Sequence, residues 1–223
     1  MFLKKKPEIY VMKYKIFTAI IFVFLMVSYG QAAVPNFGDD GLKGLSESQI
    51  KDLSEGKIIF STTDSANNES KEAKSSIITA TLLLNKLPEE IYNILYHTED
   101  QIKYLEEIKE IKIIRKSEVQ DNIEFKLKIL MISLEYRVIH NFDKKNLYIH
   151  WAMDKNFNND LQSLQGFWKL YPYPGGKTLA RYGSNVSVKN VPGWLENMFK
   201  KKGVEKSLNC VKKYVNTGWI LKK

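Results

Sequence analysis

Cysteine is almost absent from this chain of 223 residues, which contains a single one, Cys210. One cysteine cannot form a disulfide within the chain, and a domain of this length does not need one. The simplest interpretation of Cys210 is a small buried side chain on a helix, not a reactive thiol. The hydrophobic core must therefore supply the stability of the fold.

Histidine is scarce too, and the sequence carries no familiar catalytic or metal-binding motif. The three histidines are His97, His140 and His150, and there is no HExxH motif, no Cys/His ligand spacing and no GxSxG elbow. These absences leave a zinc enzyme and a serine hydrolase without support. We expect no metal and no cofactor, and His140 is the one candidate for acid–base chemistry.

Positive charge is in excess, but its pattern is not that of a nucleic-acid-binding protein. The formal net charge is +9, and it falls to +5 without the first 33 residues, which hold five lysines and one glutamate. No arginine-rich tract or base-reading motif is present, so nucleic acid is not an expected partner. A moderately basic surface is common among ordinary domains and is also compatible with anionic lipid.

The N-terminus has the three parts of a secretory signal peptide. Lysines at positions 4, 5, 6, 13 and 15 precede an apolar run over residues 16–27, and the small residues of Gly30-Gln31-Ala32-Ala33 follow. This order predicts export, to the periplasm or the cell exterior, with cleavage after Ala32 or Ala33. The apolar run is shorter than the ~20 residues of a spanning helix. An uncleaved N-terminal membrane anchor is the alternative.

The rest of the chain predicts a lead-in followed by a domain rich in strands. Residues 34–44 are expected to be flexible, and the polar stretches 64–75 and 155–165 are expected to be loops. A short helix is predicted over 45–54, with Ser46 as its N-cap. Strands are predicted at 57–62, 76–84, 109–116, 123–131, 133–142, 147–153, 166–171 and 179–186, and helices from Pro88, over 98–105, and from Pro192 through Val215.

Alternation of apolar and polar residues indicates which side chains of these strands face inward. The clearest run places five side chains on one face: Ile123, Phe125, Leu127, Ile129 and Met131. The same pattern predicts that the side chains of Tyr136, His140, Trp151 and Trp168 face inward. A Pro-Gly-Gly turn over 174–176 then joins the strand of Trp168 to the strand of Tyr182, whose inward face the pattern leaves open.

The order of elements is a strand, two short helices, six meandering strands and a long C-terminal helix. Such an order predicts an α+β fold and excludes repeated βαβ units. We divide the chain into a signal peptide (1–33), a lead-in with a short helix (34–56), one domain (57–216) and a tail (217–223).

Four local signatures occur along this order of elements. They are Leu87-Pro88-Glu89-Glu90-Ile91-Tyr92, Gly166-Phe167-Trp168-Lys169-Leu170, Gly176-Lys177-Thr178-Leu179 leading into Tyr182, and Val191-Pro192-Gly193-Trp194-Leu195. Together they resemble the START-like, or SRPBCC, superfamily, and within it the polyketide cyclase/dehydrase and coenzyme-Q-binding START-like domains. The resemblance covers residues 56–216. It departs from that family at Tyr92, where tryptophan is common, and near Glu106-Glu107, where a proline is often found.

The resemblance implies a helix-grip fold, in which a curved antiparallel sheet wraps around the C-terminal helix and encloses an apolar cavity for a lipid, quinone or isoprenoid. Aromatic side chains suit such a cavity because they combine a large apolar area with one polar group. The predicted ligand-binding residues are Tyr136, Trp151, Trp168, Tyr182, Met198, Phe199 and Leu208. For each of them, simple core packing against the helix is the competing interpretation.

Three functions follow from these expectations. The first is an exported protein that binds or carries a hydrophobic ligand without catalysis. The second is an enzyme of the cyclase or dehydratase type, which would need an enclosed pocket and a second polar group beside His140. The third is an interaction module with a filled cavity. A lysine cluster at Lys200-Lys201-Lys202 also suggests transient contact with a membrane surface, although a solvated helix end is the simpler explanation.

Overall fold

The computed structural model describes residues 35–63, 77–129, 131–188 and 202–222 of the chain. Its strands are β1 (Ile59–Thr63), β2 (Ile77–Leu84), β3 (Ile108–Lys116), β4 (Gln120–Ile129), β5 (Ile132–Asp143), β6 (Tyr148–Met153), β7 (Leu161–Tyr173) and β8 (Lys177–Val188). Its helices are α1 (Glu47–Ser54), α2 (Pro88–Tyr96), the 3-10 helix η2 (Thr98–Lys103) and α4 (Gly203–Thr217).

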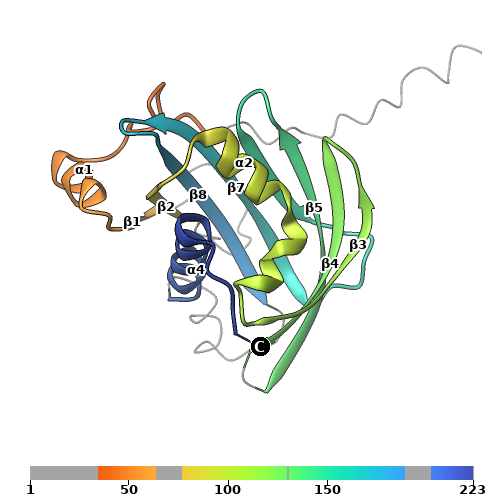
Figure 1. The fold of residues 1–223 in the computed structure, drawn as a ribbon. Helices are drawn as coiled ribbons and strands as arrows, with labels where there is room; N and C mark the ends of the chain where they lie inside the picture. Colours follow the sequence, from red (N-terminus) through yellow and green to blue (C-terminus); the bar gives the residue numbers. More distant parts are fainter. Residues whose placement is uncertain (1–34, 64–76, 130, 189–201, 223) are drawn as a thin grey trace, which may run out of the picture. The chain divides into compact units, whose positions relative to one another are not determined.

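The strands form one eight-stranded antiparallel sheet in the order β1-β2-β8-β7-β6-β5-β4-β3. Strands β3 to β8 follow one another as a meander, and β2 then pairs with β8. Figure 1 shows α2 and α4 on the same side of the curved sheet. We call this side the inner face and the opposite side the outer face. The predicted α+β helix-grip architecture is confirmed.

Helix boundaries follow the chemistry of single residues. Ser46 caps α1, because its hydroxyl accepts a hydrogen bond from the Gln49 amide while the Gln49 side chain accepts one from the Ser46 amide. Pro88 opens α2 at a position where a missing amide hydrogen costs little. Gly218 ends α4 in the left-handed conformation. The first part of the predicted C-terminal helix lies outside the described residues.

The inner face carries the larger core. Ala80, Trp168 and Leu170 of the sheet pack against α2 and against the apolar stripe of α4. That stripe consists of Val204, Leu208, Val211 and Val215, all buried. Its spacing of three or four residues is the one predicted from the sequence, because it places all four side chains on one side of a helix.

The outer face carries a second core that the sequence pattern did not predict. Buried Tyr171 and Leu179 of β7 and β8 pack with Leu53 of α1, and Phe37 and Leu42 of the lead-in pack against them. The lead-in was expected to be flexible. Instead it is fixed by the Lys43 carbonyl, which accepts a hydrogen bond of 2.9 Å from the Arg181 guanidinium, and by Phe37, whose ring lies 4.1 Å from that guanidinium.

Two other expectations are wrong in detail. Strand β7 begins at Leu161, inside the stretch 155–165 that was predicted to be a loop, and Leu161 is buried although its neighbours are polar. Met131 was placed on the inward face of its strand, but β4 ends at Ile129 and Met131 lies at the following hairpin, 92% exposed. For residues 155–165 the polar composition suggested a loop, and for Met131 the alternation was extended past the end of the strand.

Two glycines are overlaid by aromatic rings from the neighbouring strand, one on each face. Gly166 of β7 pairs with Trp151 of β6, and Gly183 of β8 pairs with Phe167 of β7. A Cβ atom at position 166 would collide with the Trp151 indole, and one at position 183 would collide with the Phe167 ring. The absence of a side chain at each glycine is therefore what allows the ring to lie flat on the sheet.

Candidate functional site: a cavity beneath the C-terminal helix

Two rows of paired residues cross the sheet and form the floor of the site. In the first row, Asp121, His140, Trp151, Gly166 and Ser184 are consecutive partners on strands β4, β5, β6, β7 and β8. Partners in an antiparallel register project to the same face. The second row runs parallel to the first and contains Phe142, Ile149, Trp168, Tyr182 and Ala80.

Between this floor and α4 lies a partly open cavity of about 200 Å³. Aliphatic and aromatic side chains make up most of its wall: Leu95, Tyr104, Leu105, Phe125, Tyr136, Val138, Ile149, Trp151, Leu164, Trp168, Tyr182, Leu208 and Val211. The remaining lining residues are Thr98, Gln101, His140, Ser184 and Ser207. An apolar wall with a few polar groups is typical of sites for small organic molecules.

The polar groups are not scattered, because two of them, Thr98 and His140, are joined by hydrogen bonds through the buried Asp121. Asp121 is fully buried, and its Oδ1 atom lies 2.7 Å from Nδ1 of His140. The Oγ1 hydroxyl of Thr98, on η2, donates a hydrogen bond of 3.0 Å to Oδ2 of the same carboxylate. His140 is itself buried and lies among the rings of Phe125, Phe142 and Trp151. A buried carboxylate requires such partners.

Two phenols also line the cavity, Tyr136 of β5 and Tyr182 of β8. Burial raises the pKa of Tyr136 and of Tyr182, although the hydrogen bond between Tyr182 and Ser184 opposes the shift at Tyr182. Both phenols therefore stay protonated at neutral pH and can donate or accept a hydrogen bond. The Tyr182 ring lies 4.7 Å from that of Trp168 and 5.9 Å from that of Trp151.

Helix η2 covers one end of the cavity and is tied down on both sides. Glu99 accepts a hydrogen bond of 2.8 Å from Lys116 of β3, whose ammonium group also lies 4.9 Å from the centre of the Tyr96 ring. On the other side, the Tyr214 hydroxyl of α4 donates to Asp100 over 3.2 Å. These contacts hold Thr98 in reach of Asp121.

The cavity brings together five of the predicted ligand-binding residues: Tyr136, Trp151, Trp168, Tyr182 and Leu208. Met198 and Phe199 lie outside the described residues, as does the lysine cluster at 200–202 except for Lys202. His140 also lines the cavity, as its alternation predicted. Its partner Asp121 was missed, although a signal was present: Asp121 continues the inward-facing register of Ile123 and Phe125 by one step. From the sequence, Thr98 is expected only to be the first residue of the helix over 98–105.

Solved structures of other proteins share this arrangement of strands and helices. A STAR-related lipid transfer protein fragment from Xanthomonas axonopodis superposes with a TM-score of 0.55 at 10% identity, over 70% of this chain and 98% of that chain. A START superfamily protein from Mycobacterium smegmatis gives 0.54 at 17% identity, over 64% and 99% of the two chains. The chain has the START-like helix-grip fold.

A third START-like neighbour is the Zhui aromatase/cyclase from Streptomyces sp. R1128, with a TM-score of 0.52 at 8% identity, over 64% of this chain and 96% of that chain. No protein-family model matches the sequence, and no curated protein matches it either. At such low identities the likeness establishes the START-like fold alone, so the function has to be argued from the site.

Two further observations concern the part of the chain that the structure describes. None of its helices is long and apolar enough to cross a membrane. Within the same residues, no group of three or more His, Cys, Asp or Glu side chains is arranged to hold a metal ion.

Proposed function

We propose that this protein binds and carries a hydrophobic small molecule, such as a lipid fragment, quinone or isoprenoid, in the cavity beneath α4. The observation that supports this most directly is unfilled space of about 200 Å³ lined by residues of the sheet and of α4. Protein interiors are normally close-packed. An engineered apolar cavity of roughly 150 Å³ is known to take up benzene. The cavity is also the reason why we prefer ligand binding to an interaction module.

The names of the structural neighbours are consistent with this proposal. One is called a lipid transfer protein and another an aromatase/cyclase, so both a carrier and an enzyme are known on this fold. Fold alone does not decide between such functions. The choice rests on the side chains of this cavity.

Acid–base catalysis on an apolar substrate is the second candidate, and one observation favours it. His140 has the second polar group that such chemistry requires, because Asp121 orients its ring from 2.7 Å. A carrier returns its ligand unchanged, whereas a dehydratase returns a product lighter by one water molecule. Mass spectrometry of the compound extracted after incubation with wild-type protein and with a His140→Ala variant distinguishes the two functions.

Export and contact with a membrane surface remain part of the proposal. The order of lysines, apolar run and small residues before Val34 supports export, and the lysine cluster at 200–202 supports contact with anionic lipid. Cell fractionation tests the first. Co-sedimentation with anionic and neutral vesicles tests the second, and equal binding to both by wild type and a triple Lys-to-Gln variant at 200–202 would contradict it.

Ligand binding itself can be tested by filling the cavity. Ser207 of α4 lines the cavity and is partly buried, so a Ser207→Trp variant adds an indole to the empty space. Asn209, two residues further along α4, is exposed, and Asn209→Trp serves as the matched control. The neutral fluorescent probe N-phenyl-1-naphthylamine should bind to wild type and to the control, and at least tenfold more weakly to Ser207→Trp. Equal binding to all three proteins would refute the cavity as the site.

A further inference from the structure

The ring of His140 is held in one orientation by Asp121, whose carboxylate can only accept hydrogen bonds. An ionised carboxylate has no hydrogen to donate, and both oxygens of Asp121 receive hydrogen bonds: one from the Thr98 hydroxyl, the other from Nδ1 of His140. The proton of a neutral His140 ring must therefore reside on Nδ1. This leaves the Nε2 atom with a free lone pair.

Nothing in the described part of the chain uses that lone pair. His140 lines the cavity, and the only hydrogen bond of its side chain to a described residue is the one from Nδ1 to Asp121. Apart from Asp121, the side chains recorded beside the ring are aromatic: Phe125, Phe142 and Trp151. A buried acceptor surrounded by apolar side chains favours a ligand that brings its own hydrogen-bond donor.

The charge of the wall restricts the ligand further. Among the described residues that line the cavity, there is no lysine, arginine, aspartate or glutamate. A fully ionised group that enters this space would lose its hydration without meeting a counter-charge, which is costly in an apolar environment. The cavity therefore favours a neutral molecule over a carboxylate, a phosphate or an amine.

The shape of the wall suggests flat rings. Trp151 and Trp168 lie on adjacent strands, each faces the Tyr182 ring, and Phe125 stacks on Tyr136 at 5.4 Å. Aromatic rings pack favourably against such surfaces in offset or edge-on arrangements. A space of about 200 Å³ suits one ring or two fused rings better than a whole lipid.

We propose that His140, oriented by Asp121, accepts a hydrogen bond from the hydroxyl group of a neutral cyclic ligand, a phenol or a cyclic alcohol, bound in the cavity. This inference rests on the proposed function, because it specifies the ligand class of the same site. His140 would contact the ligand directly. Asp121 would be a positioning residue that acts through the tautomer of His140.

Three compounds of nearly equal size test the inference by isothermal titration calorimetry at pH 7. 2-Naphthol can donate a hydrogen bond, 2-methoxynaphthalene can only accept one, and 2-naphthoate is an anion. Wild type should bind 2-naphthol about tenfold more tightly than 2-methoxynaphthalene, which corresponds to one hydrogen bond. The anion should bind most weakly of the three.

Variants assign the preference to His140. In the double variant Asp121→Leu/His140→Phe, both polar partners are replaced together, so neither is left unpaired. Its ratio of affinities for 2-naphthol and 2-methoxynaphthalene should fall to about one, while thermal unfolding shows that the domain remains folded. Ser163→Ala, which removes a hydroxyl of β7 that is not among the described residues lining the cavity, is the control and should keep the wild-type ratio.

Asp121→Asn tests the positioning role by itself. An amide can donate to Nδ1, which moves the ring proton to Nε2 and turns His140 into a donor toward the cavity. The affinity for 2-naphthol should then fall relative to 2-methoxynaphthalene. If Asp121 had a purely structural role, its substitution would lower the affinity for all three compounds alike. That result would overturn the assignment of Asp121 as a positioning residue.

The remaining outcomes are decisive as well. Equal affinity of wild type for 2-naphthol and 2-methoxynaphthalene, or tightest binding of 2-naphthoate, would overturn the inference. If N-phenyl-1-naphthylamine binds but none of the three compounds does, the inference fails while the proposed function stands. If the probe does not bind either, the proposed function fails with it.

Discussion

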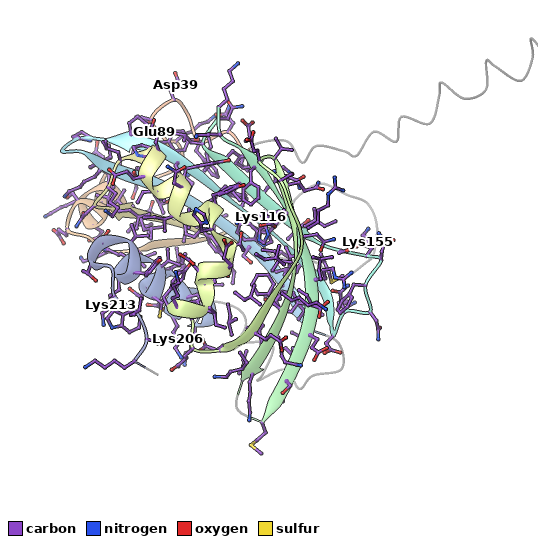
Figure 2. All side chains as sticks on the ribbon, turned by 45° about the vertical axis from the view of Figure 1, so that its right-hand side comes forward. Asp39, Glu89, Lys116, Lys155, Lys206 and Lys213 are labelled. Atoms are coloured by element: carbon purple, nitrogen blue, oxygen red, sulfur yellow. The ribbon has the colours of Figure 1, made fainter. Side chains whose placement is uncertain are left out.

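The two faces of the sheet are made by the same strands and differ in how completely they are filled. On the outer face, Tyr171 and Leu179 are covered by the lead-in and α1, and Leu179 is fully buried. On the inner face, Trp168 and Tyr182 share their surroundings with a cavity of about 200 Å³. Figure 2 shows Lys155 on the outer side of the sheet, away from Lys206 and Lys213 of α4.

The polar groups of the two faces differ in the same way. On the outer face, buried Arg181 is satisfied by the Thr81 hydroxyl at 2.5 Å and by the Lys43 carbonyl. On the inner face, no described residue forms a hydrogen bond with Nε2 of His140, and we propose that a ligand uses this atom. We infer that the outer core supplies stability, and that this allows the inner face to keep a site at which packing and hydrogen bonding are incomplete.

The strongest test of this comparison is to truncate one leucine on each face. Leu179→Ala leaves a void in the outer core, and we expect it to lower the free energy of unfolding by about 3 kcal/mol. Leu164→Ala, at a half-buried position in the cavity wall, should cost less, about 2 kcal/mol. Urea unfolding measures both. Equal losses would show that the inner face is as tightly packed as the outer one.

A smaller effect is expected from Arg181→Met, which removes both hydrogen bonds and leaves the Lys43 carbonyl unpaired. We expect a loss of about 2 kcal/mol in the free energy of unfolding. The affinity for N-phenyl-1-naphthylamine should not change, since Arg181 points away from the cavity. Arg115→Met on exposed β3 is the control and should leave both quantities as they are. A change in probe affinity in the Arg181 variant would mean that the two faces are coupled.

The smallest predicted effect is on the stability of the fold at acidic pH. Burial alone raises the pKa of Glu99, but hydrogen bonds from Lys116, the backbone and His97 lower it overall. Since the folded-state pKa lies below the unfolded value of 4.5, the ionised carboxylate stabilises the fold above pH 4.5. This contribution disappears as the pH falls through the folded pKa.

Unfolding curves between pH 6 and pH 3 therefore should show a shallower acid-induced loss of stability in Glu99→Gln than in wild type. If Lys116 is the cause, Lys116→Met added to Glu99→Gln should change the slope no further. A double variant with an additional change would assign the acid sensitivity to other carboxylates. The hydrogen bonds of Arg181 to a hydroxyl and a backbone carbonyl do not titrate in this range, so the outer face should be unaffected.

Local patterns predicted the inner face well. Alternation along single strands placed Trp168 and His140 inward, and the spacing of Leu208 and Val211 identified the packed side of α4. Each of these patterns reflects a contact with one continuous hydrophobic interior. The α+β class followed from the order of strands and helices, whereas the START-like fold was implied by the resemblance of that order and of the four local signatures to a known family. That the aromatic residues bind a ligand stays a prediction, because placement in the wall of a cavity is not binding.

The outer core could not be predicted in the same way. Phe167 and Tyr171 alternate with inward residues, so their positions look solvent-facing unless a second layer is known to cover them. The lead-in that covers them is rich in glycine and aspartate, as a flexible segment would be. The contact between Asp121 and His140 depends on the register of β4 against β5, which no single-strand pattern specifies.

The glycines beneath Trp151 and Phe167 have a consequence for how this protein can vary. Because a Cβ atom at Gly166 or Gly183 would occupy the place of the ring above it, neither position is free to change alone. A side chain at 166 should be accepted only together with a smaller residue at 151, and one at 183 only together with a smaller residue at 167. Among sequences descended from a common ancestor, these four positions should be inherited as two linked pairs.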